Sequence, residues 1–370
     1  MKINLLALKQ NNPHFPVMIQ EIMNYLLLPL PSLDPINYLN NMPIDDSQGN
    51  NIYMENSHHE QIFLDCTFGA GGYSKVILEN TQAKVIALDR DKTVEPYAQK
   101  LIELYPKRFT FVLSKFSNFD EVLKKLKITA LDGIIMDLGI STMQINNGNR
   151  GFSFKEDNYL SMEMGLNQMP AYDFINKANE KTLADVIHYY GEEIKARQIA
   201  KNIVIKRNSN PIKTAKELAN VIMEITGKGA FGKIHPATKT FQAIRIYIND
   251  ELKELQIALK KSLKYLKHQG QSPGRLLVVS FHSLEDRIVK DFFNDHGKVK
   301  KKFDKDNFNN ITQSQGKFTL YKLNDPTLEI KDYLSDNLLI INKKPIVPTS
   351  QEIKINPPSS SAKLRVALKL

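Results

Sequence analysis

Five apolar segments of strand length place the strongest constraint on what this 370-residue chain can fold into. Near-continuous apolar runs that alternate with helical patterns are typical of parallel strands whose sheet is covered on both faces. The sequence therefore predicts an α/β fold built on a parallel sheet. The segments are QIFLDCTF (61–68), KVIALD (84–89), FTFVL (109–113), LDGIIMDLG (131–139) and RLLVVSFHS (275–283).

The interval between the fourth and fifth segments is very long and mostly helical in pattern, which predicts a helical domain inserted into the sheet domain. Residues 29–60 contain prolines and asparagines without an apolar period, so we expect an insertion loop there. A first helix is expected near 16–28 and one long helix at 238–266, whereas no element is predicted for 303–360. The predicted domains are the first part of the sheet domain at 1–144, the helical domain at 145–235, and the second part of the sheet domain, with a basic C-terminal region, at 236–370.

Composition narrows the class of protein. Hydrophobic residues make up 42% of the chain, yet no apolar run approaches the roughly 20 residues of a membrane span. The N-terminus also lacks a basic segment that leads into an apolar stretch, so a cytoplasmic protein without a membrane anchor is expected.

The single cysteine, Cys66, excludes an internal disulfide and a multi-cysteine zinc site. The net charge of +10 includes a lysine cluster at 298–305, which fits either a phosphate backbone or a solvated face.

The first apolar segment leads into a glycine cluster, DCTFGAGGYS at 65–74, and the second ends in Asp89. Glycines gather where the backbone turns sharply or approaches a ligand closely. A carboxylate about twenty residues further on can accept hydrogen bonds from ribose hydroxyls. A dinucleotide fingerprint would have glycine where Ser74 stands, and an acid, Asp65, ahead of the glycines suits the cationic S-adenosylmethionine better than a pyrophosphate. A methyl donor is therefore favoured over a dinucleotide.

More polar residues follow the fourth and fifth segments, in MDLGIS (136–141) and SFHSLEDR (280–287). Parallel sheets bind ligands beyond the carboxyl ends of their strands. No cysteine follows the fourth segment to attack a pyrimidine ring, whereas an exocyclic amine needs only an acceptor for its proton as the methyl group arrives. The predicted acceptor is Asp137 or a backbone carbonyl near Gly139, with His282 and Asp286 in reserve, and no metal is required.

An ordered series of motifs resembles the bacterial 16S rRNA (cytosine-N4) methyltransferases of the RsmH/MraW type. The series is HFPVMIQEI at 14, DCTFGAGGYS at 65, ALDRD at 87, DGIIMDLGIST at 132, RGFSF at 150, IHPATKTFQAIRIYINDEL at 234, GRLLVVSFHSLEDRIVK at 274 and SAKLRV at 361. The resemblance implies a class I, Rossmann-like methyltransferase fold with an inserted helical domain. It also implies S-adenosylmethionine as donor and a cytidine in the decoding region of 16S rRNA, in the small ribosomal subunit, as acceptor. The family's cofactor contacts fall on Gly71, Gly72, Tyr73, Asp89, Phe116, Asp137 and Gln144.

The helical side supplies candidates for contact with RNA. Arg245 and Asn249 are four residues apart and therefore share a helix face. We expect this helix, RGFSF and the loop FHSLEDR to enclose a flipped-out cytosine, with Phe152 or Phe154 as the stacking surface. The predicted substrate contacts are Phe152, Phe154, His235, Arg245, Asn249, Ser283 and Arg287.

The chain departs from the family pattern in two places. After RGFSF the family shows L-D-M-R-M, whereas this chain has Ser161 and Glu163 in LSMEM, and arginines ahead of SAKLRV are replaced by Pro358 and Ser360. These changes bear on RNA engagement and leave the cofactor loop intact. Two rival functions are a non-catalytic ribosome-assembly factor and a DNA amino-methyltransferase, although DLGIST lacks the PPY-type segment that is usual in the latter. A monomer and a homodimer both stay open.

Overall fold

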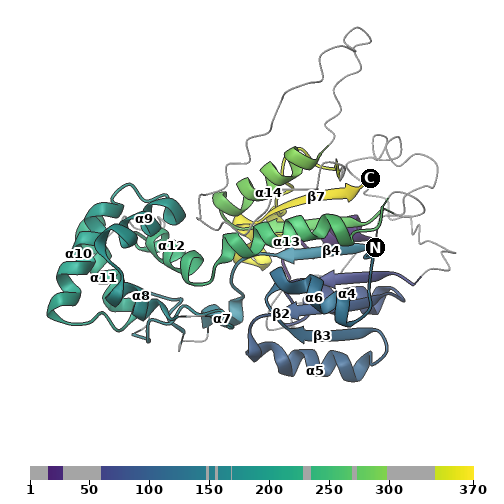
Figure 1. Cartoon of the computed structure of the whole chain (residues 1–370), viewed down its shortest axis with the longest axis horizontal. Coiled ribbons are helices and arrows are strands. Elements are labelled where there is room, and N and C mark those ends of the chain that lie inside the picture. The colour runs from purple at the N-terminus through teal and green to yellow at the C-terminus, as the bar shows by residue number, and fades with distance from the viewer. Residues whose placement is uncertain are drawn as a thin grey trace, which may run out of the picture.

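The computed structural model describes residues 16–27, 60–146, 150–154, 157–167, 169–227, 235–268, 273–297 and 338–370. Figure 1 shows a layered α/β sheet domain with a separate group of helices, the helical domain, beside it. The predicted α/β class with an inserted helical domain is confirmed. Nearly all of the insertion predicted at 29–60, and the lysine cluster at 298–305, lie outside the described residues.

A seven-stranded sheet forms the centre of the sheet domain, in the order β3-β2-β1-β4-β5-β7-β6. The strands are β1 (Ile62–Asp65), β2 (Lys84–Asp89), β3 (Phe109–Leu113), β4 (Gly133–Asp137), β5 (Arg275–Ser280), β6 (Leu338–Ile340) and β7 (Lys363–Lys369). Strands β1 to β5 pair in parallel, whereas β7 is antiparallel to both of its neighbours. The five apolar segments of the sequence contain the five parallel strands.

The strand order creates a crevice at one edge of the sheet. The chain runs outward from β1 to β2 and β3, and then returns to β4 on the other side of β1. Ligands bind beyond the carboxyl ends of the strands at such a reversal. Three of these strands end in an aspartate at that edge: Asp65 in β1, Asp89 in β2 and Asp137 in β4.

Helices cover both faces of the sheet, as strands without polar alternation require. They are α2 (Ile19–Leu26), α4 (Gly72–Asn80), α5 (Glu95–Leu104), α6 (Phe119–Lys125), α13 (Glu251–Tyr265) and α14 (Ser283–His296). Helices α2, α4 and α5 pack on one face, against side chains such as Phe63 and Ile135. Helices α6, α13 and α14 pack on the other, against Leu64 and Ile134.

The helical domain has an apolar core of its own. Its helices are α8 (Ala171–Lys177), α9 (Glu180–Gly191), α10 (Ala196–Ser209), α11 (Ala215–Thr226) and α12 (Thr238–Ile248). Phe241, Ile244 and Ile248 of α12 are buried in this core, although they lie beyond residue 235. We therefore propose Asn249 as the limit of the helical domain.

The single long helix predicted at 238–266 is wrong. Helix α12 ends at Ile248 and α13 begins at Glu251, with Asp250 between them in the left-handed conformation at φ 54°. Aspartate is among the few residues that visit this conformation. The apolar period conceals the break because α12 buries its face in the helical domain while α13 buries its face on the sheet.

The C-terminal segment completes the sheet, although the sequence predicts little for it. Strand β7 lies between β5 and β6 and follows α15 (Ser350–Ile355) and a short 3-10 helix, η4 (Pro357–Ser361). Glu352 of α15 accepts a hydrogen bond from the amide of Met18 (2.6 Å), which ties this segment to the start of α2. Among the described residues, no helix has the length and apolar character to cross a membrane.

Candidate functional site

A pocket opens at the carboxyl ends of β1, β2 and β4, in the crevice that the strand order creates. Its charged lining is five carboxylates and one arginine: Asp89, Asp137, Glu251, Glu254, Glu285 and Arg90. Glu251 and Glu254 are paired with Arg245 (2.8 Å) and Lys115 (3.3 Å). No ion pair engages Asp89 or Asp137 among the described residues. Such a lining favours a ligand that carries positive charge.

The glycine loop turns the chain from β1 into α4. Gly71 has a φ of 79°, and a Cβ there would lie 2.8 Å from the ring of Phe68. A Cβ on Gly72 would lie 2.8 Å from Pro16. These two glycines therefore allow the chain to pack against itself, while Gly69 forms the pocket wall. A cofactor contact of Gly71 or Gly72 stays a prediction.

Asp65 does not face the pocket, which corrects the interpretation that this acid attracts the cation. Its buried carboxylate accepts hydrogen bonds from the hydroxyl of Ser74 (2.7 Å) and the amide of Thr67 (3.2 Å), and so closes the loop. Cys66 lies on the wall, but burial raises the pKa of its thiol well above the usual range. A thiol that stays protonated is a poor nucleophile.

Asp89 joins the glycine loop to the pocket. Its Oδ2 accepts from the amide of Gly69 (2.8 Å) and its Oδ1 from the amide of Asp91 (2.9 Å). Burial raises the pKa of this carboxyl to about 6, although the two amide bonds oppose the shift. Each carboxylate oxygen has a further lone pair, so Asp89 can still accept hydrogen bonds from a ribose.

Asp137 places one oxygen of its carboxyl at the pocket without a partner. Oδ1 is buried and has no hydrogen bond in the described part of the chain, whereas Oδ2 lies 3.1 Å from the phenol oxygen of Tyr73. Burial raises the pKa of Asp137 to about 8; the Tyr73 bond opposes this shift, and the charges of Asp65 and Glu285 add to it. Tyr73 stands behind the wall and holds Asp137, so its predicted cofactor contact stays a prediction.

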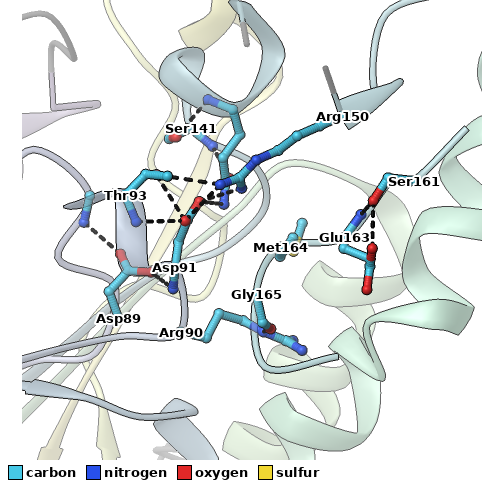
Figure 2. Close-up of polar contacts among 12 residues, drawn as sticks. Asp89, Arg90, Asp91, Thr93, Ser141, Arg150, Ser161, Glu163, Met164 and Gly165 are labelled. Atoms are coloured by element: carbon cyan, nitrogen blue, oxygen red, sulfur yellow. Dashed lines mark hydrogen bonds and ion pairs between the residues drawn. The ribbon is translucent and has the colours of Figure 1, made fainter. Parts of the chain in front are cut away.

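Phe116 and Gln144, which only the resemblance assigns to the cofactor, both lie on the pocket wall. Phe116 begins the 3-10 helix η2 (Phe116–Asn118) after β3. Gln144 lies in α7 (Thr142–Asn146), where its Oε1 accepts from the amide of Ser141 (3.0 Å) and its Nε2 donates to Asp91 (2.9 Å). Asp91 precedes the 3-10 helix η1 (Lys92–Val94) and binds Arg150 through both carboxylate oxygens (Figure 2). The sequence gives no signal for this pair.

Asn249 has a structural role, and its predicted contact with substrate stays a prediction. Its side chain is completely buried, accepts from the amide of Met164 (2.9 Å) and donates to the carbonyl oxygen of Met162 (2.9 Å). Arg90 donates to the carbonyl oxygens of Asn249 (2.8 Å) and Gly165 (2.6 Å). Together these bonds hold the helical domain against the pocket.

Arg245, the other residue predicted on this helix face, points at an acid of the pocket wall. Its guanidinium makes two bonds to Glu251, of 2.8 and 3.0 Å, and only 15% of its side chain is exposed. We therefore assign Arg245 to the support of the wall, and its contact with RNA stays a prediction.

The two reserve acceptors do not line the pocket. His282 is the N-cap of α14, where its Nδ1 accepts from the amide of Glu285 (3.4 Å) and the carboxylate of Glu285 in turn accepts from the amide of His282 (3.4 Å). This reciprocal capping leaves Glu285 on the wall in place of His282. Asp286 turns toward β7 and pairs with Arg365 (2.7 Å), so the geometry favours Asp137 over it as the acceptor, and its assignment in reserve stays a prediction.

Two predicted substrate contacts join the domains. Ser283 and Arg287 bond to the carboxylate of Glu192 at the end of α9, at 2.8 and 3.0 Å. All three side chains lie at the surface, so contact with RNA there stays a prediction.

The aromatic candidates lie on the helical domain. Phe154 stacks on His235, with ring centroids 4.1 Å apart, and meets the edge of Phe241. Phe152 is also partly buried against the helical core. One face of Phe154 is therefore occupied by His235. Stacking on a base stays a prediction for Phe152 and Phe154, and contact with substrate stays one for His235.

The departures from the family pattern have local partners. The Ser161 hydroxyl donates to Glu163 (2.7 Å), so the two replacements bond to each other (Figure 2). Pro358 forms part of the pocket wall, and Ser360 is exposed. The departures thus reach the rim of the pocket as well as the helical side.

One group of described residues could hold a metal ion. Ligand atoms of Glu251, His282 and Glu285 all lie within 4.8 Å of one another. Arg245 already binds Glu251, and Nε2 of His282 lies 3.2 Å from Glu285. The protein itself therefore supplies cationic or polar partners to both carboxylates.

The chain is similar to known proteins over almost its whole length, and residues 11–370 match the MraW methylase family. The protein named ribosomal RNA small subunit methyltransferase H of Orientia tsutsugamushi (strain Ikeda) is 42% identical over 363 residues, covering 97% of this chain and 99% of that protein. The protein of the same name from Rickettsia conorii is 44% identical over 308 residues, covering 82% and 91%. A solved rRNA methylase of Streptococcus thermophilus matches 84% of this chain and 87% of its own length, at 12% identity and a TM-score of 0.33. The chain belongs to the MraW methylase family.

Proposed function

We propose that this protein transfers a methyl group from S-adenosylmethionine to the exocyclic amine, N4, of a cytidine in the decoding region of 16S rRNA. The observation that carries the proposal is the pocket lining of five carboxylates and one arginine. S-adenosylmethionine carries a sulfonium and an ammonium group, which Asp89 and Asp137, the wall acids outside any ion pair among the described residues, can face, and a cation there favours the ionised form of Asp137. The excess of acids over bases on the wall disfavours the pyrophosphate of a dinucleotide. Membership of a methylase family supports the reaction, and the names of the relatives support the small-subunit rRNA as substrate.

The wall residues fit the parts of this donor. Asp89 would accept the ribose hydroxyls, Phe116 would pack against the adenine, and Asp137 would face the cationic end with its unpartnered Oδ1. Bound there, S-adenosylmethionine supplies an electrophilic methyl carbon. Cys66 plays no covalent part, because burial keeps its thiol protonated.

Asp137 is the proposed acceptor of the amine proton. The lone pair of N4 is delocalised into the cytosine ring, so a hydrogen must be drawn away as the bond to the methyl carbon forms. A cation beside Asp137 lowers the pKa of its carboxyl and prepares the ionised form. Tyr73 holds Oδ2, which leaves Oδ1 to take the proton.

The proposed partner is the small ribosomal subunit or its 16S rRNA, and a cytoplasmic location follows from that partner. A DNA acceptor has no observation in its favour. A non-catalytic assembly factor would have no need of an unpartnered carboxyl oxygen at the cofactor pocket.

The proposal is tested by incubating the purified protein with radiolabelled S-adenosylmethionine and one of three acceptors. The acceptors are small ribosomal subunits from a strain that lacks its own version of the enzyme, naked 16S rRNA, and duplex DNA. Label is expected in the RNA of the subunits or in naked 16S rRNA. Label in DNA alone, or donor binding without transfer to any acceptor, would favour one of the two rivals.

A further inference from the structure

Three consecutive residues at the end of β2 reach three different parts of the molecule (Figure 2). Asp89 bonds to the glycine loop, and Arg90 bonds to the helical domain through the carbonyl oxygens of Gly165 and Asn249. Asp91 binds Arg150, the first residue of RGFSF. The motif ALDRD therefore joins the pocket to the helical side as well as supplying the expected ribose carboxylate.

The carboxylate of Asp91 is buried, and both of its oxygens accept hydrogen bonds. Its Oδ1 accepts from the amide (3.0 Å) and hydroxyl (2.8 Å) of Thr93 and from Nη2 of Arg150 (2.8 Å). Its Oδ2 accepts from Nη1 of Arg150 and from Nε2 of Gln144 (2.9 Å). Burial would raise the pKa of Asp91, but these bonds outweigh it and hold the pKa below its usual value. An ionised carboxylate in a two-bond pair with arginine fixes orientation as well as distance.

Two partners of Asp91, Gln144 and Arg150, connect it to the pocket wall and to the helical domain. Gln144 lies on the pocket wall and holds Ser141, another wall residue, through its amide (3.0 Å). The carbonyl oxygen of Arg150 accepts from the amide of Met162 (2.6 Å), whose own carbonyl is bonded to Asn249. One buried ion pair thus fixes a wall of the pocket and the entry of the chain into the helical domain.

We propose that Asp91 and Arg150 are positioning residues that couple the binding of the methyl donor to the binding of RNA. This inference rests on the proposed function. A donor packed against Gln144 stabilises one arrangement of the pair, and RNA bound against the helical domain stabilises the same arrangement. Each ligand then raises the affinity for the other by the same factor, and such factors are typically about 5- to 150-fold.

Equilibrium dialysis of labelled S-adenosylhomocysteine, with and without saturating small ribosomal subunits, measures this coupling. The wild-type protein is expected to bind at least about fivefold more tightly when subunits are present. Asp91→Asn should bring the factor close to one. Arg150→Lys should do the same, because lysine keeps the charge but loses the two-bond geometry.

Asp132→Asn is the matched control. Asp132 is a buried carboxylate just before β4, at the amino end of the sheet, and both its oxygens bond to Lys267 at 2.7 Å. This variant removes a comparable buried pair away from the pocket and should keep the coupling. Turnover gives a second readout: in Asp91→Asn the KM for subunits should rise by the factor of coupling lost, while kcat changes little.

Loss of coupling in Asp91→Asn and Arg150→Lys, but not in Asp132→Asn, supports the inference. No coupling in the wild-type protein, unchanged coupling in both variants, or a loss that Asp132→Asn shares would each overturn it. Failure of the wild-type protein to methylate subunits would instead count against the proposed function. If the wild-type protein methylates subunits but the variants keep the coupling, the coupling role of Asp91 and Arg150 is contradicted while the proposed function stands.

Discussion

Tyr73 and Asp137 share a hydrogen bond of 3.1 Å, in which the phenol donates to Oδ2 of the carboxyl. The phenol oxygen of Tyr73 also lies 2.5 Å from the carbonyl oxygen of Val17, which can only accept. A phenol has one hydrogen to donate, so the carboxyl of Asp137 shares that hydrogen with the Val17 carbonyl, and the bond stabilises the ionised form only weakly. This agrees with burial raising the pKa of Asp137 to about 8. The acceptor is therefore neutral at pH 7 until a cation lies beside it.

Donor binding should release a proton. The cation favours the ionised form of Asp137, so its pKa falls on binding and about one proton leaves near pH 7. Asp65 and Asp89, whose pKa values are about 6, are already largely ionised there. Calorimetry of S-adenosylmethionine binding in buffers of different ionisation enthalpy measures the release, which should fade as pH rises past 8. Absence of release in the wild-type protein, or equal release in Asp137→Asn, would contradict a neutral Asp137.

Asp137→Asn should lose turnover. Asparagine keeps the shape of the side chain but takes up no proton, and loss of a general base typically costs about 10²- to 10⁴-fold in rate. Single-turnover transfer to small subunits measures the chemical step, and Asp132→Asn serves as the control with a buried carboxylate away from the pocket. If Asp137→Asn kept full turnover with unchanged affinity for the donor, Asp137 would not be the acceptor of the amine proton.

Gly71→Ala should destabilise the fold. The left-handed conformation costs a residue with a Cβ about 1–2 kcal/mol, and contact with the Phe68 ring at 2.8 Å adds overpacking of about 1–3 kcal/mol. Urea unfolding measures the loss. A double-mutant cycle with Phe68→Leu separates the two causes, because removing the ring should relieve the overpacking alone. Strict additivity in the cycle would show that Phe68 does not limit this position.

Restoring the family pattern with Ser161→Asp and Glu163→Arg should change little. Backbone bonds to Asn249 and Arg90 hold this segment, and a partly exposed ion pair contributes about 0–1 kcal/mol. The melting temperature and the transfer rate to subunits report the effect. A large gain in transfer by the double variant would instead mean that these positions contact RNA.

Much of the sheet could be predicted because each parallel strand is marked by the residues of its own segment and not by distant contacts. Each parallel strand is an unbroken apolar segment, and Asp89 and Asp137 stand where those segments end. The break between α12 and α13 escapes prediction because both helices keep one apolar period while they bury it in different cores. Strand β7 is not predicted because it begins and ends with a lysine, Lys363 and Lys369, and such charged ends are not typical of a strand inside a sheet.

Residues of the candidate site could be predicted from the sequence only where their contacts come from nearby residues of the same motif. Arg245 and Asn249 share a helix face as their spacing predicts, but spacing does not reveal that Glu251 and a buried backbone segment cover that face. Asp286 is likewise taken by Arg365 from a distant strand. Asp91 and Arg150 are missed for the same reason, since their pairing depends on the packing of two domains.

Nucleoside analysis of 16S rRNA tests the central claim most directly. Small subunits from a strain without its own enzyme are incubated with S-adenosylmethionine and either the wild-type protein or Asp137→Asn, and the digested rRNA is examined by mass spectrometry. We expect N4-methylcytidine after incubation with the wild-type protein and little or none with Asp137→Asn. A methyl group on a ring carbon or on another base, or no methylated nucleoside despite donor binding, would contradict the account.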